Sequence, residues 1–268
     1  MKIIIVCSTM EYLSGSPLYN YTLALELAKE HKVSVLSRWR YNSLQMDLED
    51  AGVKCLDETN EHYDIALVSQ RDMPLPSADK VINIIHSEYD CETPRENIEH
   101  YVAIRPSIKE HLVNEHNIPE DKITVIYNGI DLERFSPREK SERDYFKVVI
   151  PATRDSLRQK MFDYYVKKAS KDYRVFIYGK NFGADIQGDY VYQYDEVANI
   201  EDFIGDADLV AGILLGRVNL EARAMDIKSV IHNPENPEDM YEYYPDRDEF
   251  DKNHDIKNVA KQLIYGGQ

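Results

Sequence analysis

The sequence is poor in cysteine and has no long apolar run. Its three cysteines, Cys7, Cys55 and Cys91, are odd in number and far apart. This spacing fits neither a metal site nor a disulfide framework, so the sequence predicts no bound metal and a reducing, cytoplasmic location. No apolar run approaches the roughly 20 residues of a transmembrane helix, and Met1–Cys7 is too short for the core of a signal peptide. These absences predict no transmembrane segment and leave peripheral attachment to a membrane open.

Positive charge is also scarce, with 32 Lys and Arg against 48 Asp and Glu and a formal net charge of −16. Such a field repels phosphates and anionic lipids, which argues against a nucleic-acid partner. The GxGxxG motif is missing, so a dinucleotide cofactor is not supported and we expect no cofactor. Hydrophobic residues make up 43% of the chain, enough for one large or two small domains.

The most informative local pattern is Thr124–Pro137 (TVIYNGIDLERFSP). It begins with a short apolar run that predicts a buried strand. Asn128-Gly129 then predicts a turn, because both residues tolerate φ > 0. Asp131 is suited to cap a short helical turn, and Phe135 offers an apolar anchor after it. A charged segment, Pro137–Asp144, follows and is predicted to link two α/β domains.

Buried β-branched runs alternate with helical patterns on both sides of this segment, which predicts parallel sheets in two successive domains, residues 1–140 and 141–268. Two stretches are ambiguous: Asn97–Ala103 is predicted to be helical, with a short strand at Val102–Ile104 as the alternative, and the acidic stretch Asn233–Asp255 is predicted to be a loop with one helical turn. The predicted strands are Lys2–Cys7, Val33–Leu36, Tyr63–Ser69, Lys80–His86, Ile123–Ile126, Phe146–Ile150, Arg174–Tyr178, Tyr190–Tyr194, Ala207–Ala211 and Ser229–His232.

The Asn128–Phe135 segment resembles a strand–Asn-Gly–x–Asp–x–x–x–Phe stretch of glycosyltransferase family 4. The stretch Leu220–Ile231 resembles the family's LEAMA-x-G-x-PVI sequence. The resemblance implies a GT-B fold, in which two Rossmann-like, doubly wound domains face each other across a cleft. It also implies a retaining, metal-independent glycosyltransferase that moves a sugar from a UDP- or GDP-sugar to a hydroxyl acceptor: a glycan, a lipid or a small molecule.

The second domain carries the implied donor site. By resemblance, Glu221 is the second glutamate of the family's signature and binds the donor's ribose hydroxyls, while Gly216 lets the backbone approach the diphosphate. Without the resemblance, the favoured interpretation of Glu221 is an acid that stabilises the start of a helix. The signature's first glutamate falls at Ile213, which cannot accept a hydrogen bond. This substitution favours an alternative, a non-catalytic module that binds nucleotide sugars or a partner.

Two basic residues, Arg154 and Lys160, fall where the family has an arginine and a lysine. Together they would neutralise the donor's phosphates as the sugar leaves. The alternative is a pair of solvated charges at the start of a helix.

In the first domain, His86 ends a predicted strand, where the family often has a histidine near the transferred sugar. Read without the resemblance, it is a hydrogen-bonded structural residue. Two further residues are donor-binding candidates: Gly15, in the loop Ser14–Pro17, and Asn128. Both are expected to face the cleft. A sugar-nucleotide epimerase is a third and weaker alternative, because it shares this architecture.

Asp206-Ala207-Asp208 matches the Asp-x-Asp metal motif of the other large glycosyltransferase fold. It runs directly into a predicted buried strand, so we interpret it as structural.

Overall fold

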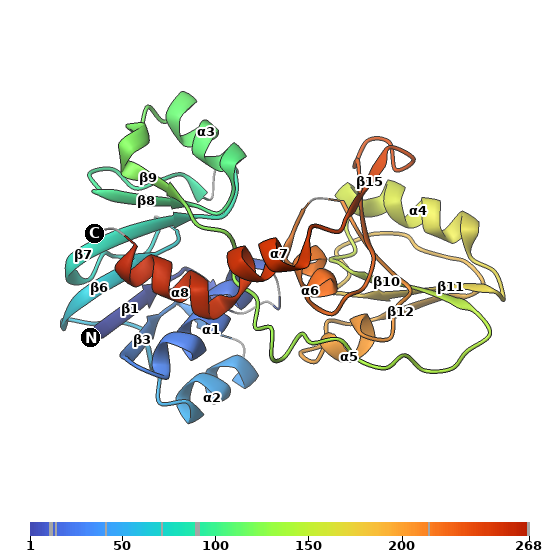
Figure 1. Ribbon diagram of the computed structural model, residues 1–268, viewed down its shortest axis with the longest axis horizontal. Helices are drawn as coiled ribbons and strands as arrows, with labels where there is room; N and C mark the ends of the chain where they lie inside the picture. Colours follow the sequence, from blue (N-terminus) through green and yellow to red (C-terminus); the bar gives the residue numbers. More distant parts are fainter. Residues whose placement is uncertain are drawn as a thin grey trace. The chain divides into compact units, whose positions relative to one another are not determined.

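The computed structural model describes residues 1–10, 13, 15–40, 42–70, 72–88, 92–213 and 215–266. Cys91 and Ser14 of the sequence analysis lie outside these ranges. The chain forms two compact units (Figure 1): the first is Met1–Gly129 with the segment from Lys252 onward, and the second is Ile130–Asp251. The division predicted from the sequence differs, because it kept the C-terminal segment with the second domain.

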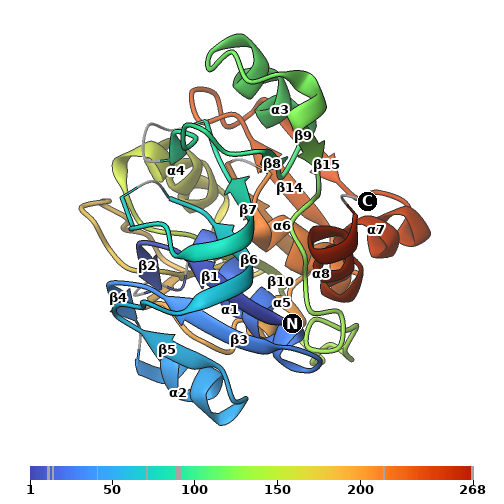
Figure 2. The ribbon, with the colours of Figure 1, turned by 90° about the vertical axis from the view of Figure 1, so that its left-hand side faces the viewer.

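The first unit is built on a seven-stranded parallel sheet in the order β5-β3-β1-β6-β7-β8-β9 (Figure 2). A separate parallel pair joins β2 (Thr9–Met10) to β4 (Trp39–Arg40). The strands of the sheet are β1 (Lys2–Val6), β3 (Lys32–Leu36), β5 (Lys54–Leu56), β6 (His62–Val68), β7 (Ser77–Ile85), β8 (His100–Ala103) and β9 (Ile123–Val125).

Strand β1 is buried on both faces, as its uninterrupted β-branched run predicts. Ile3 and Ile5 face the larger core, while Ile4 and Val6 face a smaller one on the other side of the sheet. Side chains of successive strand residues point to opposite faces, so an apolar run fills both cores. The unit's helices are α1 (Gly15–Ala28), α2 (Asn42–Asp50), α3 (Pro106–Asn114) and α8 (Ile256–Tyr265), and α8 packs against α1.

The second unit has a six-stranded sheet in the order β12-β11-β10-β13-β14-β15, in which only the β14–β15 pair is antiparallel. Two apolar cores lie on its faces, one with α4 and the other with α5 and α6. The two separate sheets confirm the predicted two α/β domains. The elements are β10 (Phe146–Pro151), α4 (Gln159–Lys168), β11 (Tyr173–Tyr178), β12 (Val191–Tyr194), α5 (Glu201–Ile204), β13 (Leu209–Gly212), α6 (Arg217–Ala224), β14 (Ser229–His232) and β15 (Met240–Tyr243). Helix α7 (Arg247–His254) begins in the second unit and ends in the first.

The Asn128-Gly129 segment lies where the first unit ends, but it forms no turn there, so the predicted turn is wrong. Neither residue is among those with positive φ. Glycine is needed at 129 for another reason: a Cβ there would lie 2.5 Å from Ile256 Cδ1 and 3.0 Å from Ile256 Cα of helix α8. The next part of the prediction is confirmed. Asp131 Oδ1 accepts the backbone N–H groups of Glu133 and Arg134 at 3.0 and 3.1 Å, and Phe135 is buried in the second unit's core.

The predicted linker Pro137–Asp144 is part of the second unit and is held there by charge. Arg143 donates to Asp206 at 2.9 Å and to Asp208 at 2.7 Å, and Lys147 Nζ donates to Asp206 at 2.7 Å. Burial alone would raise the pKa of Asp206, but the hydrogen bonds from Lys147 and the Ser141 backbone lower it to about 2. Both carboxylates of the Asp-x-Asp sequence are thus engaged by cations of the protein itself, in line with a structural role.

Two secondary-structure predictions are wrong. Asn97–Ala103 is not a helix, because His100–Ala103 is held as β8 between two neighbouring strands. The acidic stretch Asn233–Asp255 contains both β15 and the two-turn helix α7. Asp246 caps that helix by accepting the N–H groups of Asp248 and Glu249. Helix α2, missed in the sequence, has few buried positions to give it an apolar period.

Replacing Gly129 by alanine is expected to destabilise the first unit. The new methyl group would overlap Ile256, so helix α8 must shift, at a cost of about 1–3 kcal/mol for overpacking. Gly15→Ala is the matched control, because nothing lies within 4 Å of a Cβ there and alanine favours a helix. Urea denaturation of both variants measures the difference. Equal stability of Gly129→Ala and wild type would show that the contact with α8 is not tight.

Candidate functional site

A polar cluster lies at the carboxyl ends of the first unit's central strands. Ser69 follows β6 and His86 follows β7, while Asn20 comes from α1. Ser69 Oγ lies 3.3 Å from Asn20 Oδ1 and 3.4 Å from His86 Nε2. Ligands of open α/β sheets bind at this edge of the sheet. The cluster therefore occupies the position expected of a binding site.

His86 is buried and has an apolar neighbour on one side. The Tyr19 ring meets its imidazole edge-on, with 4.8 Å between ring centroids. Burial lowers the pKa of His86 to about 4, although a hydrogen bond with the Asn128 side chain opposes the shift. His86 is therefore neutral at physiological pH. A neutral imidazole positions a hydroxyl by hydrogen bonding rather than by charge.

Asn128 links this cluster to the C-terminal segment. Its side chain bonds His86, and its carbonyl oxygen lies 2.8 Å from His254 Nδ1. The structure thus brings two of the predicted site residues, His86 and Asn128, into contact. The role of His254 was missed, because no local pattern connects residues 126 positions apart in the sequence.

Two buried polar atoms around the cluster have no hydrogen-bond partner among the described residues: Tyr19 Oη and Asn20 Nδ2. Buried polar groups are normally paired, so each is a site for a water or a ligand hydroxyl. Tyr19 and Asn20 were not predicted from the sequence. Their signal there is weak, since they lie within a helix that also buries Leu23 and Ala24.

Glu92 approaches the same strand end from the loop after β7. Its Oε2 accepts the backbone N–H of His86 at 3.2 Å, and its Oε1 accepts from Gln70 Nε2 at 3.4 Å. Burial raises the pKa of Glu92 to about 7, against the effect of these two hydrogen bonds. Near pH 7 this carboxyl is therefore present in both its protonated and its ionised form.

Gly15 is the first residue of α1, on the same unit, and has open space where a side chain would be. Its part in donor binding stays a prediction.

In the second unit, Arg154 is buried and holds the ends of β11 and β12. Its Nε donates to the Gly179 carbonyl at 2.8 Å, and its two terminal nitrogens donate to Gln193 at 3.1 Å and Asp195 at 3.2 Å. Lys160, in contrast, is exposed and forms an ion pair of 2.7 Å with Glu235. The two basic residues share no partner, and their joint role at a phosphate site stays a prediction.

Glu221 lies inside the second unit on α6, the helix that Gly216 caps. It accepts a hydrogen bond of 2.7 Å from Arg217 Nε, and both side chains are less than a tenth exposed. Burial raises the pKa of Glu221 even though Arg217 opposes the shift. The Gly216 backbone N–H is held by Asn219 Oδ1 at 3.2 Å. Gly216 thus caps the short helix that carries Glu221, and the role of both residues in donor binding stays a prediction.

Ile213 is 4% exposed and belongs to the apolar core that also contains Val148 and Phe162. A glutamate in the same place would put a carboxylate among hydrocarbon groups, which is strongly unfavourable. Asp226, where the family has a glycine, has φ 62 and accepts hydrogen bonds from Arg223 and Tyr244 at 3.1 and 2.6 Å. The aspartate keeps the backbone conformation for which glycine is otherwise preferred.

Within the described ranges, no helix is long and apolar enough to cross a membrane. Among the same residues, no three His, Cys, Asp or Glu side chains come together as metal ligands.

Comparison with known proteins matches part of the chain to a protein family. Residues 86–134 match the family Glycosyltransferase Family 4. The resemblance to glycosyltransferase family 4 is confirmed. The match includes His86, Asn128 and Asp131, and it ends before the second unit's Glu221 helix. No curated protein matches the chain.

Solved structures show the same fold over almost the whole chain. A glycosyltransferase from Rickettsia africae is 15% identical with a TM-score of 0.65, covering 98% of this chain and 87% of that one. HepE from Anabaena, in complex with UDP and glucose, is 11% identical with a TM-score of 0.70 and 99% coverage of both chains. A UDP-N-acetylglucosamine 2-epimerase is 14% identical with a TM-score of 0.51, covering 99% of this chain and 87% of that one. The chain therefore has the GT-B fold of two Rossmann-like domains.

His86 and Glu92 are expected to change the free energy of unfolding with pH in opposite directions. The lowered pKa of His86 removes stability as the pH falls from 6.5 to about 4, and the raised pKa of Glu92 removes stability as the pH rises from 4.5 to about 7. In the wild type the two effects largely cancel between pH 5 and 7. His86→Gln should therefore be more stable at pH 5 than at pH 7, and Glu92→Gln less stable, each by on the order of 1–2 kcal/mol.

Denaturant unfolding at the two pH values measures both effects. A parallel response of the two variants would contradict the assignment of these pKa shifts.

Proposed function

We propose that the protein is a glycosyltransferase that moves a sugar from a nucleoside diphosphate sugar, UDP- or GDP-linked, to a hydroxyl acceptor. The observation that carries this proposal is the buried carboxylate of Glu221 on the helix capped by Gly216. By the resemblance to family 4, this glutamate is the acid that binds the ribose hydroxyls. HepE, which shares the fold over 99% of both chains, was crystallised with UDP and glucose.

On this proposal, Glu221 accepts the two ribose hydroxyls, and the Gly216 end of α6 approaches the diphosphate. A carboxylate suits this task because its two oxygens accept separate hydrogen bonds. Arg217 already uses one of these oxygens at 2.7 Å, so it fixes the carboxylate's orientation. The donor's nucleoside end is then held by a group that is oriented before binding, which lowers the entropy cost of binding.

Arg154 and Lys160 are proposed to neutralise the diphosphate. Their present acidic partners are solvent-exposed, with the side chains of Asp195 and Glu235 91% and 83% exposed. Ion pairs with such exposed groups contribute little and exchange easily. Arg154 would keep its Nε anchored on the Gly179 carbonyl and turn only its outer nitrogens toward phosphate.

In the first unit, neutral His86 is proposed to hydrogen-bond a hydroxyl of the transferred sugar, with Asn128 fixing its ring and Gly15 leaving room for the donor. The acceptor hydroxyl would bond to the anomeric carbon as the bond to the diphosphate breaks, and its proton would pass to the departing diphosphate. Retention of configuration and independence of metal follow the family resemblance, a cytoplasmic location follows the cysteine content, and all three are part of the proposal.

The alternative is a GT-B module that binds a nucleotide sugar or a partner without catalysis. Ile213 favours it, because an apolar core residue stands where the family has a sugar-contacting acid. An epimerase remains a third reading, because a UDP-N-acetylglucosamine 2-epimerase shares the fold. Restoring the acid by Ile213→Glu would not separate these readings, since the buried charge would disturb folding first.

A donor screen separates an enzyme from a binding module. We expect one or more UDP- or GDP-sugars to raise the melting temperature and to be hydrolysed slowly without an acceptor. Release of the nucleoside diphosphate, followed by chromatography, measures turnover. Binding without turnover in any donor and acceptor combination would support the module, and sugar isomerisation would support the epimerase.

Glu221→Gln is expected to weaken UDP or GDP binding about tenfold or more, because a charged acceptor is worth roughly 1.5–3 kcal/mol. Glutamine keeps the side-chain shape beside Arg217, and circular dichroism and thermal unfolding check the fold. Glu238→Gln, at an exposed position of the same unit, is the matched control. Calorimetric titration measures the affinities. Unchanged affinity in a folded Glu221→Gln protein would show that the ribose lies elsewhere.

A further inference from the structure

A cavity of about 300 Å³ opens in the second unit between helix α4 and the sheet, near the amino ends of β10, β11 and β13. Phe146, Tyr173 and Leu209, the first residues of these strands, all line it. Helix α6, which carries Glu221, follows the opposite, carboxyl end of β13. The cavity is therefore separate from the proposed donor site. Its volume is at the lower end of the range for pockets that bind small molecules, roughly 300–1,000 Å³.

Aromatic rings form much of the cavity wall. Phe146 and Tyr173 stack with 5.3 Å between ring centroids and an interplanar angle of 9°. Tyr164 and Tyr165 meet edge-on at 5.1 Å and 89°. Tyr165 is buried, and its hydroxyl lies 2.9 Å from His232 Nε2. Rings held by one another in this way give a preformed apolar surface, which suits a flat apolar ring.

Two large apolar side chains of the lining are exposed to solvent. Phe146 and Met240 are each 42% exposed, although residues 147–150 of β10, the strand that Phe146 begins, are buried. Exposed apolar groups gathered at a concave site are typical of ligand binding, because a ligand removes them from water.

The charged groups of the lining favour an anion. Lys168 forms no ion pair within the described part of the chain. Lys228 pairs at 2.5 Å with Glu242, but both side chains are half-exposed, and such pairs exchange easily. Asp208 is the acid of the described lining, and Arg143 already donates to it at 2.7 Å. The cavity thus carries a positive charge that no described acid neutralises.

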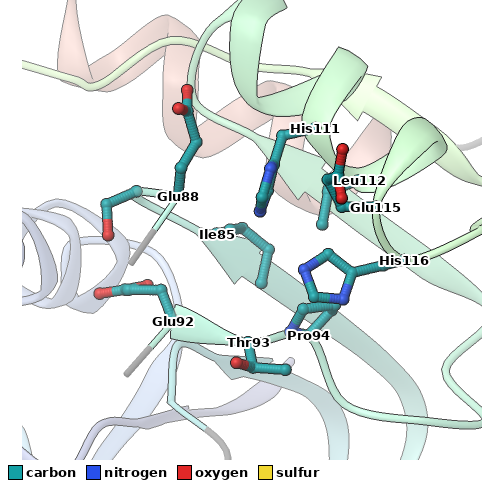
Figure 3. A pocket seen from close by; sticks show the side chains of 10 residues that line it. Ile85, Glu88, Glu92, Thr93, Pro94, His111, Leu112, Glu115 and His116 are labelled. Atoms are coloured by element: carbon teal, nitrogen blue, oxygen red, sulfur yellow. The ribbon is translucent and has the colours of Figure 1, made fainter. Parts of the chain in front are cut away.

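A cavity of about 440 Å³ beside the end of β7, in the first unit, has the opposite character (Figure 3). Glu88, Glu92 and Glu115 contribute carboxyl groups to it, and none of its described lining residues is lysine or arginine. In a protein with a formal net charge of −16, these groups repel anions. An anionic ligand therefore distinguishes the second unit's cavity from the one beside β7.

We propose that the cavity of the second unit binds a small organic anion that contains one aromatic or apolar ring. The ring would lie against Phe146 and Met240, and the anionic group would face Lys168 and Lys228. A lysine ammonium group is a point charge, so it attracts a carboxylate or a phosphate alike. The inference goes beyond the proposed function and does not depend on it.

Direct binding to the full chain tests the inference. The probes are phenyl phosphate, benzoate, benzyl alcohol, benzylamine and inorganic phosphate, titrated by ligand-observed NMR up to about 10 mM. We expect at least one of the two ring anions to bind at least about tenfold more tightly than the other three probes, because only these two combine a ring with negative charge. The tighter of the two shows whether the site prefers phosphate or carboxylate.

Three results would overturn the proposal: no binding of either ring anion, equal binding of benzyl alcohol or benzylamine, or equal binding of inorganic phosphate. An excess of UDP should leave the bound ring anion in place. Its displacement by UDP would locate the probe in a nucleotide site and would also overturn the proposal.

Lys168→Gln should lower the affinity for the preferred ring anion at least fivefold. Lys167→Gln is the matched control, since it lies beside Lys168 in the last turn of α4, is exposed and does not line the cavity. Both variants remove one positive charge and the same stabilisation of the helix dipole. Equal affinity in the two variants would overturn the assignment of the cavity.

Phe146→Ala should weaken binding of the same probe at least threefold, because it removes a surface on which the ring lies. Phe182→Ala is its control, since Phe182 is 57% exposed and lies outside the cavity lining. Thermal unfolding checks that both variants are folded. Unchanged affinity in a folded Phe146→Ala protein would show that the ring binds elsewhere and would overturn the proposal.

Discussion

The close contact between Gly129 and helix α8 is the constraint on which the first unit and its site depend. Ile256 fits against a position that has no side chain, and this holds the segment Asn128-Gly129 in place. The Asn128 carbonyl is then bonded by His254, and the Asn128 side chain bonds His86. The contact between Gly129 and Ile256 thus helps to position three polar residues, His254, Asn128 and His86, the last of which lies at the carboxyl edge of the sheet.

The titratable side chains at the carboxyl edge of the first unit's sheet are largely uncharged. His86 is kept unprotonated by burial, and Glu92 beside it is held close to its point of half-ionisation at neutral pH. Two titratable groups with shifts of opposite sign avoid a net charge in a poorly solvated place. The same carboxyl also lines the cavity beside the end of β7, and it accepts the backbone N–H of His86 at 3.2 Å.

The central strands were predictable because a continuous β-branched run, such as that of β1, has few alternatives to a buried parallel strand. Asn128-Gly129 was found by its composition. Its glycine, however, is required by a close contact with helix α8, which lies more than a hundred residues away in the sequence. For the same reason no local pattern reveals His254 or the unpartnered Tyr19 hydroxyl. The family resemblance predicted a role for Glu221, which stays a prediction, but it did not predict the buried pairing of Glu221 with Arg217.

The return of α8 to the first unit has a consequence for synthesis. The helix contributes Val259 and Leu263 to the core beneath β1, although the whole second unit precedes it in the chain. Domains usually fold as their residues emerge from the ribosome, the N-terminal one first. Here the second unit is complete on the ribosome before the first unit receives its last core helix. Until then, the apolar face that α8 covers is exposed to chaperones and to other nascent chains.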